Sequence, residues 1–155
     1  MGDVDYFLGT EFTWLHQING NISVHLCQSA FTLFTVHRFS VQIAKNISNV
    51  TPYRSGLPTD SIPPVDTLDP DLLRQLQVYQ SIVGCINWLA TCTHPNIAPV
   101  LTFLASNSNC PHPQHYKAVV YALKYLMSTN EYGISFHYKS SATIQAFNTL
   151  PPSPW

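Results

Sequence analysis

Charged side chains are scarce in this sequence. Asp, Glu, Lys and Arg make up only 10% of its 155 residues, whereas apolar residues make up 45%. Charged residues usually make up about a quarter of a soluble protein, so this surface must be partly apolar and suited to a partner or to the rest of a larger protein. The net charge of −1 also differs from the basic balance of free-standing nucleic-acid-binding proteins. We expect a soluble globular chain of about one domain.

The sequence also leads us to expect no signal peptide, no membrane span and no disulfide framework. Asp3 and Asp5 stand where a signal peptide needs basic residues, and no apolar run approaches the roughly 20 residues that span a bilayer. The four cysteines show no framework spacing: they are Cys27, Cys85, Cys92 and Cys110. We therefore expect a protein of a reducing compartment, cytoplasmic or nuclear and not secreted, with no membrane partner.

The first part of the chain has the pattern of a β-hairpin. Side chains alternate along one strand that enters from Tyr6, and Asn19-Gly20 predicts a two-residue turn, because both positions tolerate positive φ. The apolar residues on the returning strand, which ends at Cys27, are Ile22, Val24 and Leu26.

A short helix is predicted next, from Ser29 to Phe39, with Ser29 as its N-cap. Its inward-facing residues at helical spacing are Ala30, Leu33, Phe34 and His37. Prolines then exclude helix and central strand between Thr51 and Pro70, which is predicted to be a linker. The linker ends in Asp69-Pro70, an N-cap followed by proline at the first helical position.

Three helices and two strands are predicted after the linker. The helices cover about 71–92, 96–105 and 114–128, and the strands cover 134–138 and 143–147. The first and the last helix each carry an apolar face. These faces are Leu72, Leu76, Tyr79, Val83, Ile86 and Ala90 in the first helix, and Val119, Ala122, Leu123 and Leu126 in the last.

The predicted fold class is α+β, with a β-hairpin, a small helical bundle and a short closing strand pair. We divide the chain into the hairpin and first helix (1–50), the proline-rich linker (51–70), the bundle (71–130), the strand pair (131–148) and a disordered tail (149–155).

A series of short motifs follows one order along the chain. They are Tyr6-Phe7-Leu8-Gly9, Leu26-Cys27-Gln28, Tyr79-Gln80-Ser81-Ile82-Val83-Gly84, Trp88-Leu89-Ala90, Thr93-His94-Pro95-Asn96, Leu123-Lys124-Tyr125-Leu126 and Tyr132-Gly133-Ile134. In this order they resemble the downstream part of the reverse transcriptase of copia-type retrotransposons. The resemblance covers about Asp3 to Phe147. It implies that the hairpin lies near a primer terminus and that the helices form a polymerase thumb.

The resemblance implies a part of a polymerase that holds nucleic acid and does no chemistry. Two-metal phosphoryl transfer needs clustered carboxylates, which that family supplies on an upstream aromatic-x-Asp-Asp hairpin, and this chain has no Asp-Asp pair. We therefore predict no catalytic residue, no metal ligand and no cofactor here, although the full-length family enzyme uses a divalent metal such as Mg2+. The implied partners are an RNA or DNA template–primer, bound weakly, and the remainder of the polymerase, with no small-molecule substrate.

The candidate nucleic-acid surface lies on the last helix. Lys117, Tyr121, Lys124 and Ser128 are spaced so that they lie opposite the apolar face of that helix. Lysines there are placed to meet phosphates, and an aromatic ring between them to pack on a sugar or base. A solvated helix face has the same pattern, so the resemblance is what favours binding.

Two other interpretations stay open. Basic residues of the family pattern are replaced at Gln80, His94 and Met127-Ser128, which is typical of a decayed or co-opted fragment that is a protein-interaction module or has no activity. A small zinc-binding domain is the third interpretation. Its possible ligands are Cys92, His94, Cys110, His112 and His115.

Overall fold

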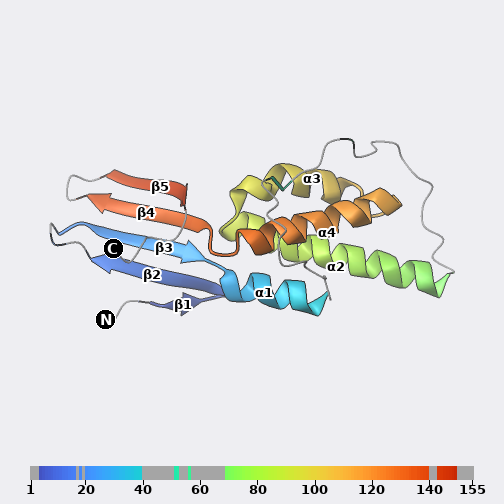
Figure 1. Ribbon diagram of the computed structural model, residues 1–155, viewed down its shortest axis with the longest axis horizontal. Helices are drawn as coiled ribbons and strands as arrows, with labels where there is room; N and C mark the ends of the chain where they lie inside the picture. Colours follow the sequence, from blue (N-terminus) through green and yellow to red (C-terminus); the bar gives the residue numbers. More distant parts are fainter. Residues whose placement is uncertain are drawn as a thin grey trace.

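The chain has a β-sheet at one end and a helical bundle at the other (Figure 1). The structure, a computed structural model, describes residues 4–16, 18, 20–39, 51–52, 56, 69–139 and 143–149. The elements are β1 (Tyr6–Phe7), β2 (Thr10–His16), β3 (Ile22–Cys27), α1 (Ser29–Arg38), α2 (Pro70–Cys92), the 3-10 helix η1 (Pro95–Ile97), α3 (Ala98–Ser106), α4 (Pro113–Ser128), β4 (Gly133–Lys139) and β5 (Thr143–Thr149). The α+β class is confirmed, and the predicted linker and tail lie mostly outside the described residues.

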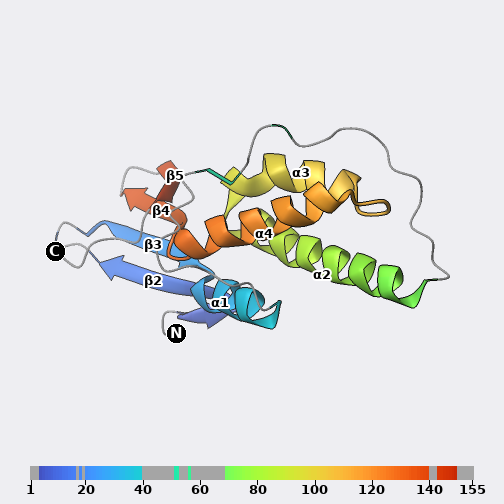
Figure 2. The ribbon, with the colours of Figure 1, turned by 45° about the vertical axis from the view of Figure 1, so that its right-hand side comes forward.

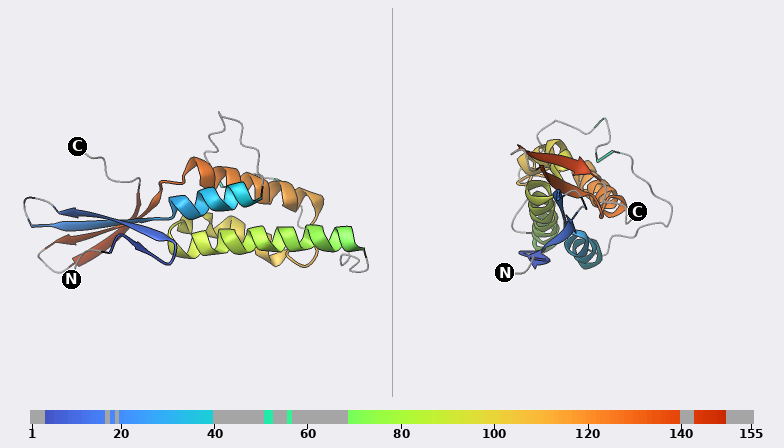
Figure 3. Two further views of the ribbon diagram at one scale, coloured as in Figure 1. Left: turned by 90° about the horizontal axis from the view of Figure 1, so that it is seen from below. Right: turned by 90° about the vertical axis from the view of Figure 1, so that its left-hand side faces the viewer.

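One antiparallel sheet contains five strands in the order β1-β2-β3-β4-β5. β3 pairs with β4, which places Val24 opposite Phe136 and Leu26 opposite Ile134. The predicted hairpin and the predicted closing pair therefore belong to a single sheet. Seen from below, the strands extend away from the helices, and α1 and α4 lie next to the sheet (Figure 3).

The turn between β2 and β3 differs from the prediction. The observed register places Trp14 opposite Val24, whereas a two-residue turn at Asn19-Gly20 would place Trp14 opposite His25. The pairing ends at His16 and Ile22, so this register does not fit the predicted two-residue turn, of which Asn19 lies outside the described residues. A slip of one residue turns every side chain to the opposite face, and in the observed register the buried residues of β3 are Ser23 and His25.

A tight turn occurs instead between β1 and β2. Phe7 pairs with Thr10, and the two residues between them, Leu8 and Gly9, have φ of 49° and 80°. Positive φ at both central residues is typical of a type I′ turn. A leucine rarely adopts positive φ. The prediction of one continuous strand from Tyr6 is therefore wrong.

The predicted inward face of α1 is also wrong. Leu33 and Phe34 are 45% and 59% exposed, whereas Thr32, Thr35 and Val36 are buried. The hydroxyl of Thr35 donates to the carbonyl of the residue four positions earlier in the helix, at 2.9 Å. A threonine whose hydroxyl is satisfied by its own helix is inexpensive to bury. This accounts for Thr35, whereas the buried hydroxyl of Thr32 has no hydrogen-bond partner among the described residues.

The start of α1 is capped by a side chain of β2 rather than by Ser29. The N-cap residue is Gln28, and its side chain makes no capping hydrogen bond. The backbone N–H of Ala30 donates to Glu11 Oε1 of β2 at 2.9 Å, and the Ser29 hydroxyl donates to the carbonyl of Asn130 at 2.9 Å. Long-range contacts with the sheet and with the α4–β4 connection thus fix this helix end.

The bundle of α2, α3 and α4 agrees closely with the prediction. Asp69 caps α2 by accepting hydrogen bonds from the backbone N–H groups of Asp71 and Leu72, and Pro70 opens the helix. Leu72 is 41% exposed, so its predicted inward position is wrong, because it lies beyond the end of the packed core. Figure 2 shows α4 packed beside α2 and α3 in one bundle. None of the described helices is long and apolar enough to cross a membrane.

The core contains aromatic and aliphatic side chains from all three of these helices. Tyr79 is fully buried, and its hydroxyl donates to the carbonyl of Leu104 at 2.9 Å. Its ring meets Tyr116 of α4 edge-on, with centroids 5.1 Å apart. Burial raises the pKa of Tyr79, so it stays a neutral hydrogen-bond donor.

Candidate nucleic-acid interface

α4 turns its apolar stripe into the bundle and its basic side outwards. The predicted inward residues are all buried: they are Val119, Ala122, Leu123 and Leu126. The predicted nucleic-acid residues lie on the other side, where Lys117 and Ser128 are exposed and Tyr121 and Lys124 are half-buried. The helix phase predicted from the sequence is therefore confirmed.

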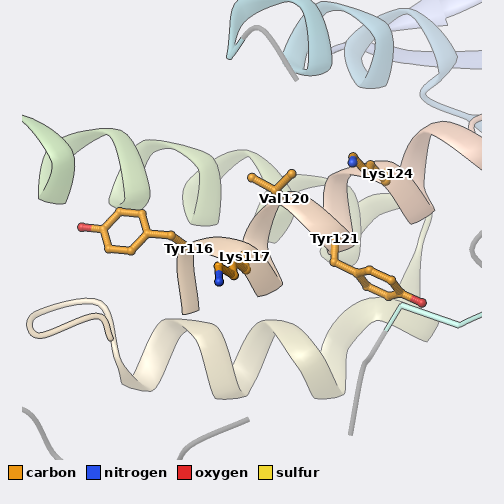
Figure 4. Close-up of a pocket in the computed structure, with 5 residues that line it drawn as sticks. All are labelled: Tyr116, Lys117, Val120, Tyr121 and Lys124. Carbon is orange, nitrogen blue, oxygen red and sulfur yellow. The ribbon is translucent and has the colours of Figure 1, made fainter. Parts of the chain in front are cut away.

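Three of the four predicted residues line one groove along α4. Lys117, Tyr121 and Lys124 surround a groove of about 410 Å³ together with Tyr116 and Val120 (Figure 4). Ser128 is not part of the lining, and its hydroxyl donates to the carbonyl of Tyr125 at 2.8 Å. The structure thus brings the two lysines and an aromatic ring together and leaves the serine out.

Sequence reasoning missed Tyr116 and Val120. They lie at four-residue spacing with Lys124, on the stripe of α4 next to the predicted one. Figure 4 shows Val120 between the two tyrosines, whose rings extend in different directions from α4. The ring of Tyr116 is held by its edge-on contact with Tyr79, so this end of the groove is anchored to the core.

The helix that lines the groove carries no negative side chain. α4 contains no Asp and no Glu and carries Lys117 and Lys124, whereas α2, which packs against it, carries Asp71 at its start. The carboxylates that the structure describes belong to other parts of the chain: Asp5, Glu11, Asp69, Asp71 and Glu131. An anion at the groove therefore meets two lysines of α4 and no carboxylate of that helix.

A buried histidine links the bundle to the sheet connection. His94 has no exposed surface. Its Nε2 lies 3.1 Å from the carbonyl of Thr129, and its Nδ1 lies 2.9 Å from the hydroxyl of Thr93, which also bonds Gln28 Oε1 at 2.9 Å. A carbonyl only accepts, so Nε2 carries a hydrogen. Burial lowers the pKa of His94 below its usual value, despite the opposing effect of the Thr129 carbonyl.

The candidate zinc ligands are used in other ways. His94 bonds Thr93 and Thr129, and at the start of α4 the Nδ1 atoms of His112 and His115 accept backbone N–H groups as a capping box. In the described part of the chain, no three His, Cys, Asp or Glu side chains come close enough to hold a metal ion. The zinc interpretation gains no support from this arrangement.

The positions at which this chain lacks a basic residue of the family pattern differ in their exposure to solvent. His94 lies in the interior, so a cation there would not reach a nucleic acid. Gln80 is exposed, and its side-chain amide donates to the carbonyl of Ser108 at 3.1 Å. Ser128 is exposed as well. The replacement at His94 therefore changes the interior and leaves the outer charge of the bundle as it was.

Two curated proteins are similar to this chain. It is 25% identical, over 94% of its length, to a retrovirus-related Pol polyprotein from transposon RE2 of Arabidopsis thaliana. It is 33% identical, over 45% of its length, to a protein named secreted RxLR effector protein 161 from Plasmopara viticola. These matches span 9% and 49% of the two relatives. No protein-family model matches the chain, and no solved structure matches it significantly.

The longer of these similarities is the informative one. It includes nearly the whole chain, from the sheet through the bundle, and corresponds to a small part of a much longer polyprotein. The chain is therefore related, at low identity, to a segment of a retrotransposon Pol polyprotein.

Proposed function

We propose that this chain is the thumb and connection part of a copia-type RNA-directed DNA polymerase, which holds template–primer nucleic acid without catalysing synthesis. The observation that carries the proposal is the groove on α4, where Lys117, Tyr121 and Lys124 come together on a helix free of carboxylates. The similarity to a Pol polyprotein along 94% of the chain supports the same assignment. The proposed partners are a template–primer, bound weakly, and the remainder of the polymerase.

Weak and sequence-independent binding follows from this geometry. Lysines meet phosphates, which carry no base information, and only two lysines line the groove. Each phosphate contact contributes about one unit to the slope of log affinity against log salt. The slope should therefore be shallow, and the affinity no better than about the micromolar range of non-specific contacts.

A binding titration with matched charge variants tests the proposal. We expect Lys117→Ala and Lys124→Ala each to weaken binding of a labelled RNA–DNA hybrid and to lower the salt slope by about one. Arg74→Ala is the matched control, because it removes an exposed cation of α2 that does not line the groove. Equal losses for all three variants would show that the groove has no special role.

A protein-interaction module is the second candidate, and one observation favours it. Tyr6, Phe7 and Leu8 are between 60% and 67% exposed at the edge of the sheet, which is unusual for large apolar side chains next to each other. A folded chain that binds neither hybrid nor single-stranded nucleic acid at low salt would favour this second candidate.

A further inference from the structure

The groove on α4 is small and concave. All five residues that line it, between Tyr116 and Lys124, come from α4, and its volume is about 410 Å³. This volume is in the range of small-ligand sites, roughly 300–1,000 Å³, although a groove lined by one helix stays open to solvent. A paired and stacked duplex presents a stiff convex surface that can rest on such a groove, whereas a single unstacked nucleotide is small enough to enter it.

The order of side chains along α4 suits a strand with one exposed base. Tyr121 lies four residues after Lys117 and three residues before Lys124, so each lysine is its neighbour on the helix surface. With a rise of 1.5 Å per residue, the lysines stand about 10 Å apart along the axis, one on each side of the tyrosine. Val120 supplies apolar surface beside the ring.

We infer that this groove takes one unpaired nucleotide of a single strand, with its base against Tyr121 and its flanking phosphates near Lys117 and Lys124. The inference rests on the proposed function and narrows it, because it predicts that unpaired nucleic acid binds better than a fully paired duplex. Base–aromatic stacking tolerates any base, so the preference concerns pairing and not sequence.

Three labelled probes of the same length test the inference at low salt: a DNA single strand, the same strand in a duplex, and a strand with the same phosphates but no bases. We expect the single strand to bind more tightly than either of the others. Stacking contributes about 1–3 kcal/mol per base, so Tyr121→Leu should weaken single-strand binding about five-fold or more and leave the abasic strand unchanged. Tyr121→Phe, which keeps the ring, should restore the affinity.

Tyr6→Leu is the matched control, because Tyr6 is 61% exposed on β1 and does not line the groove. If Tyr121→Leu has no effect while Lys117→Ala still weakens binding, the inference is overturned and the proposed function stands. Tighter binding of the duplex, or equal binding of the abasic strand, overturns it too, even if Tyr121→Leu fails to fold. Failure of every probe to bind overturns both the inference and the proposed function.

Discussion

At the scale of single residues, His94 is a fully buried histidine with a partner at each ring nitrogen. Its ring has no exposed surface and lies between Thr93 and the carbonyl of Thr129. Burial lowers the pKa of His94, and burial also lowers that of His25, which bonds Ser135 and the carbonyl of Glu131. Both rings therefore contact the connection between α4 and β4 in their neutral form.

This arrangement predicts that acid destabilises the fold. In the unfolded chain a histidine takes up a proton near its usual pKa of 6.5, whereas the folded chain resists it. The free energy of unfolding should have its full value above about pH 6.5. It should decrease as the pH falls below that value, by at most about 1.4 kcal/mol per pH unit for each histidine. Denaturant titrations across this pH range measure the slope.

His94→Gln separates the effect of this residue from that of the other histidines. Glutamine can donate to Thr129 but does not titrate, so the variant should be less stable at neutral pH and less dependent on pH below 6.5. The exposed His37 is the control for the substitution itself, and His37→Gln should leave the stability at neutral pH unchanged. A slope that is unchanged in His94→Gln would contradict this account.

At the scale of elements, the sequence predicts the bundle well and the region around α1 poorly. α2 and α4 have long apolar stripes, and each begins with a proline. Asp69 caps α2, and these local signals agree with the structure. α1 is short, and its buried face depends on Thr32 and Thr35, which spacing rules treat as polar. Its cap comes from Glu11 of β2, and no local pattern reveals such a contact.

The sequence predicted only part of the groove, because local patterns do not show how the helices pack. The phase of α4 places Lys117, Tyr121 and Lys124 on the outer side, and this follows from the apolar stripe alone. The inclusion of Tyr116 depends on its contact with Tyr79 of α2, which requires knowledge of how the helices pack. Ser128 lies about one helical turn beyond Lys124, outside the lining, and its hydroxyl donates to the carbonyl of Tyr125.

The pairing of β3 with β4 predicts that any side chain at Gly133 would destabilise the sheet. A Cβ atom at Gly133 would lie 1.9 Å from the carbonyl oxygen of Leu26, which is backbone and cannot rotate away. Gly133→Ala should therefore lower the free energy of unfolding by about 1–3 kcal/mol or more, because the two strands must separate locally. Urea denaturation measures the change.

Gly84 provides the matched control for this substitution. It lies on the exposed side of α2, and a Cβ atom there would meet nothing within 4 Å. Gly84→Ala should stabilise the chain by up to about 1 kcal/mol, because alanine favours helix. If Gly133→Ala is as stable as the original chain, the β3–β4 register described here is wrong.

At the scale of the whole molecule, the two ends of the sequence meet in one sheet and the bundle extends from its end (Figure 1). The sequence shows that the strands exist, but the pairing of Ile22–Cys27 with Gly133–Lys139 joins segments separated by the bundle, and no local signal specifies it. The bundle is thereby held at a fixed end of the sheet, with the α4 groove on its outer side.

The measurement that tests the central claim most directly is an amide NMR titration of the nitrogen-15-labelled chain with an RNA–DNA hybrid carrying a single-stranded overhang. The account predicts shifts that are concentrated between Tyr116 and Lys124, and that fade as salt is added, because phosphate contacts release counterions. The acidic start of α2, at Asp69 and Asp71, should stay unchanged. Absence of shifts on α4, or shifts centred instead on Tyr6, Phe7 and Leu8, would contradict the claim that this helix holds nucleic acid.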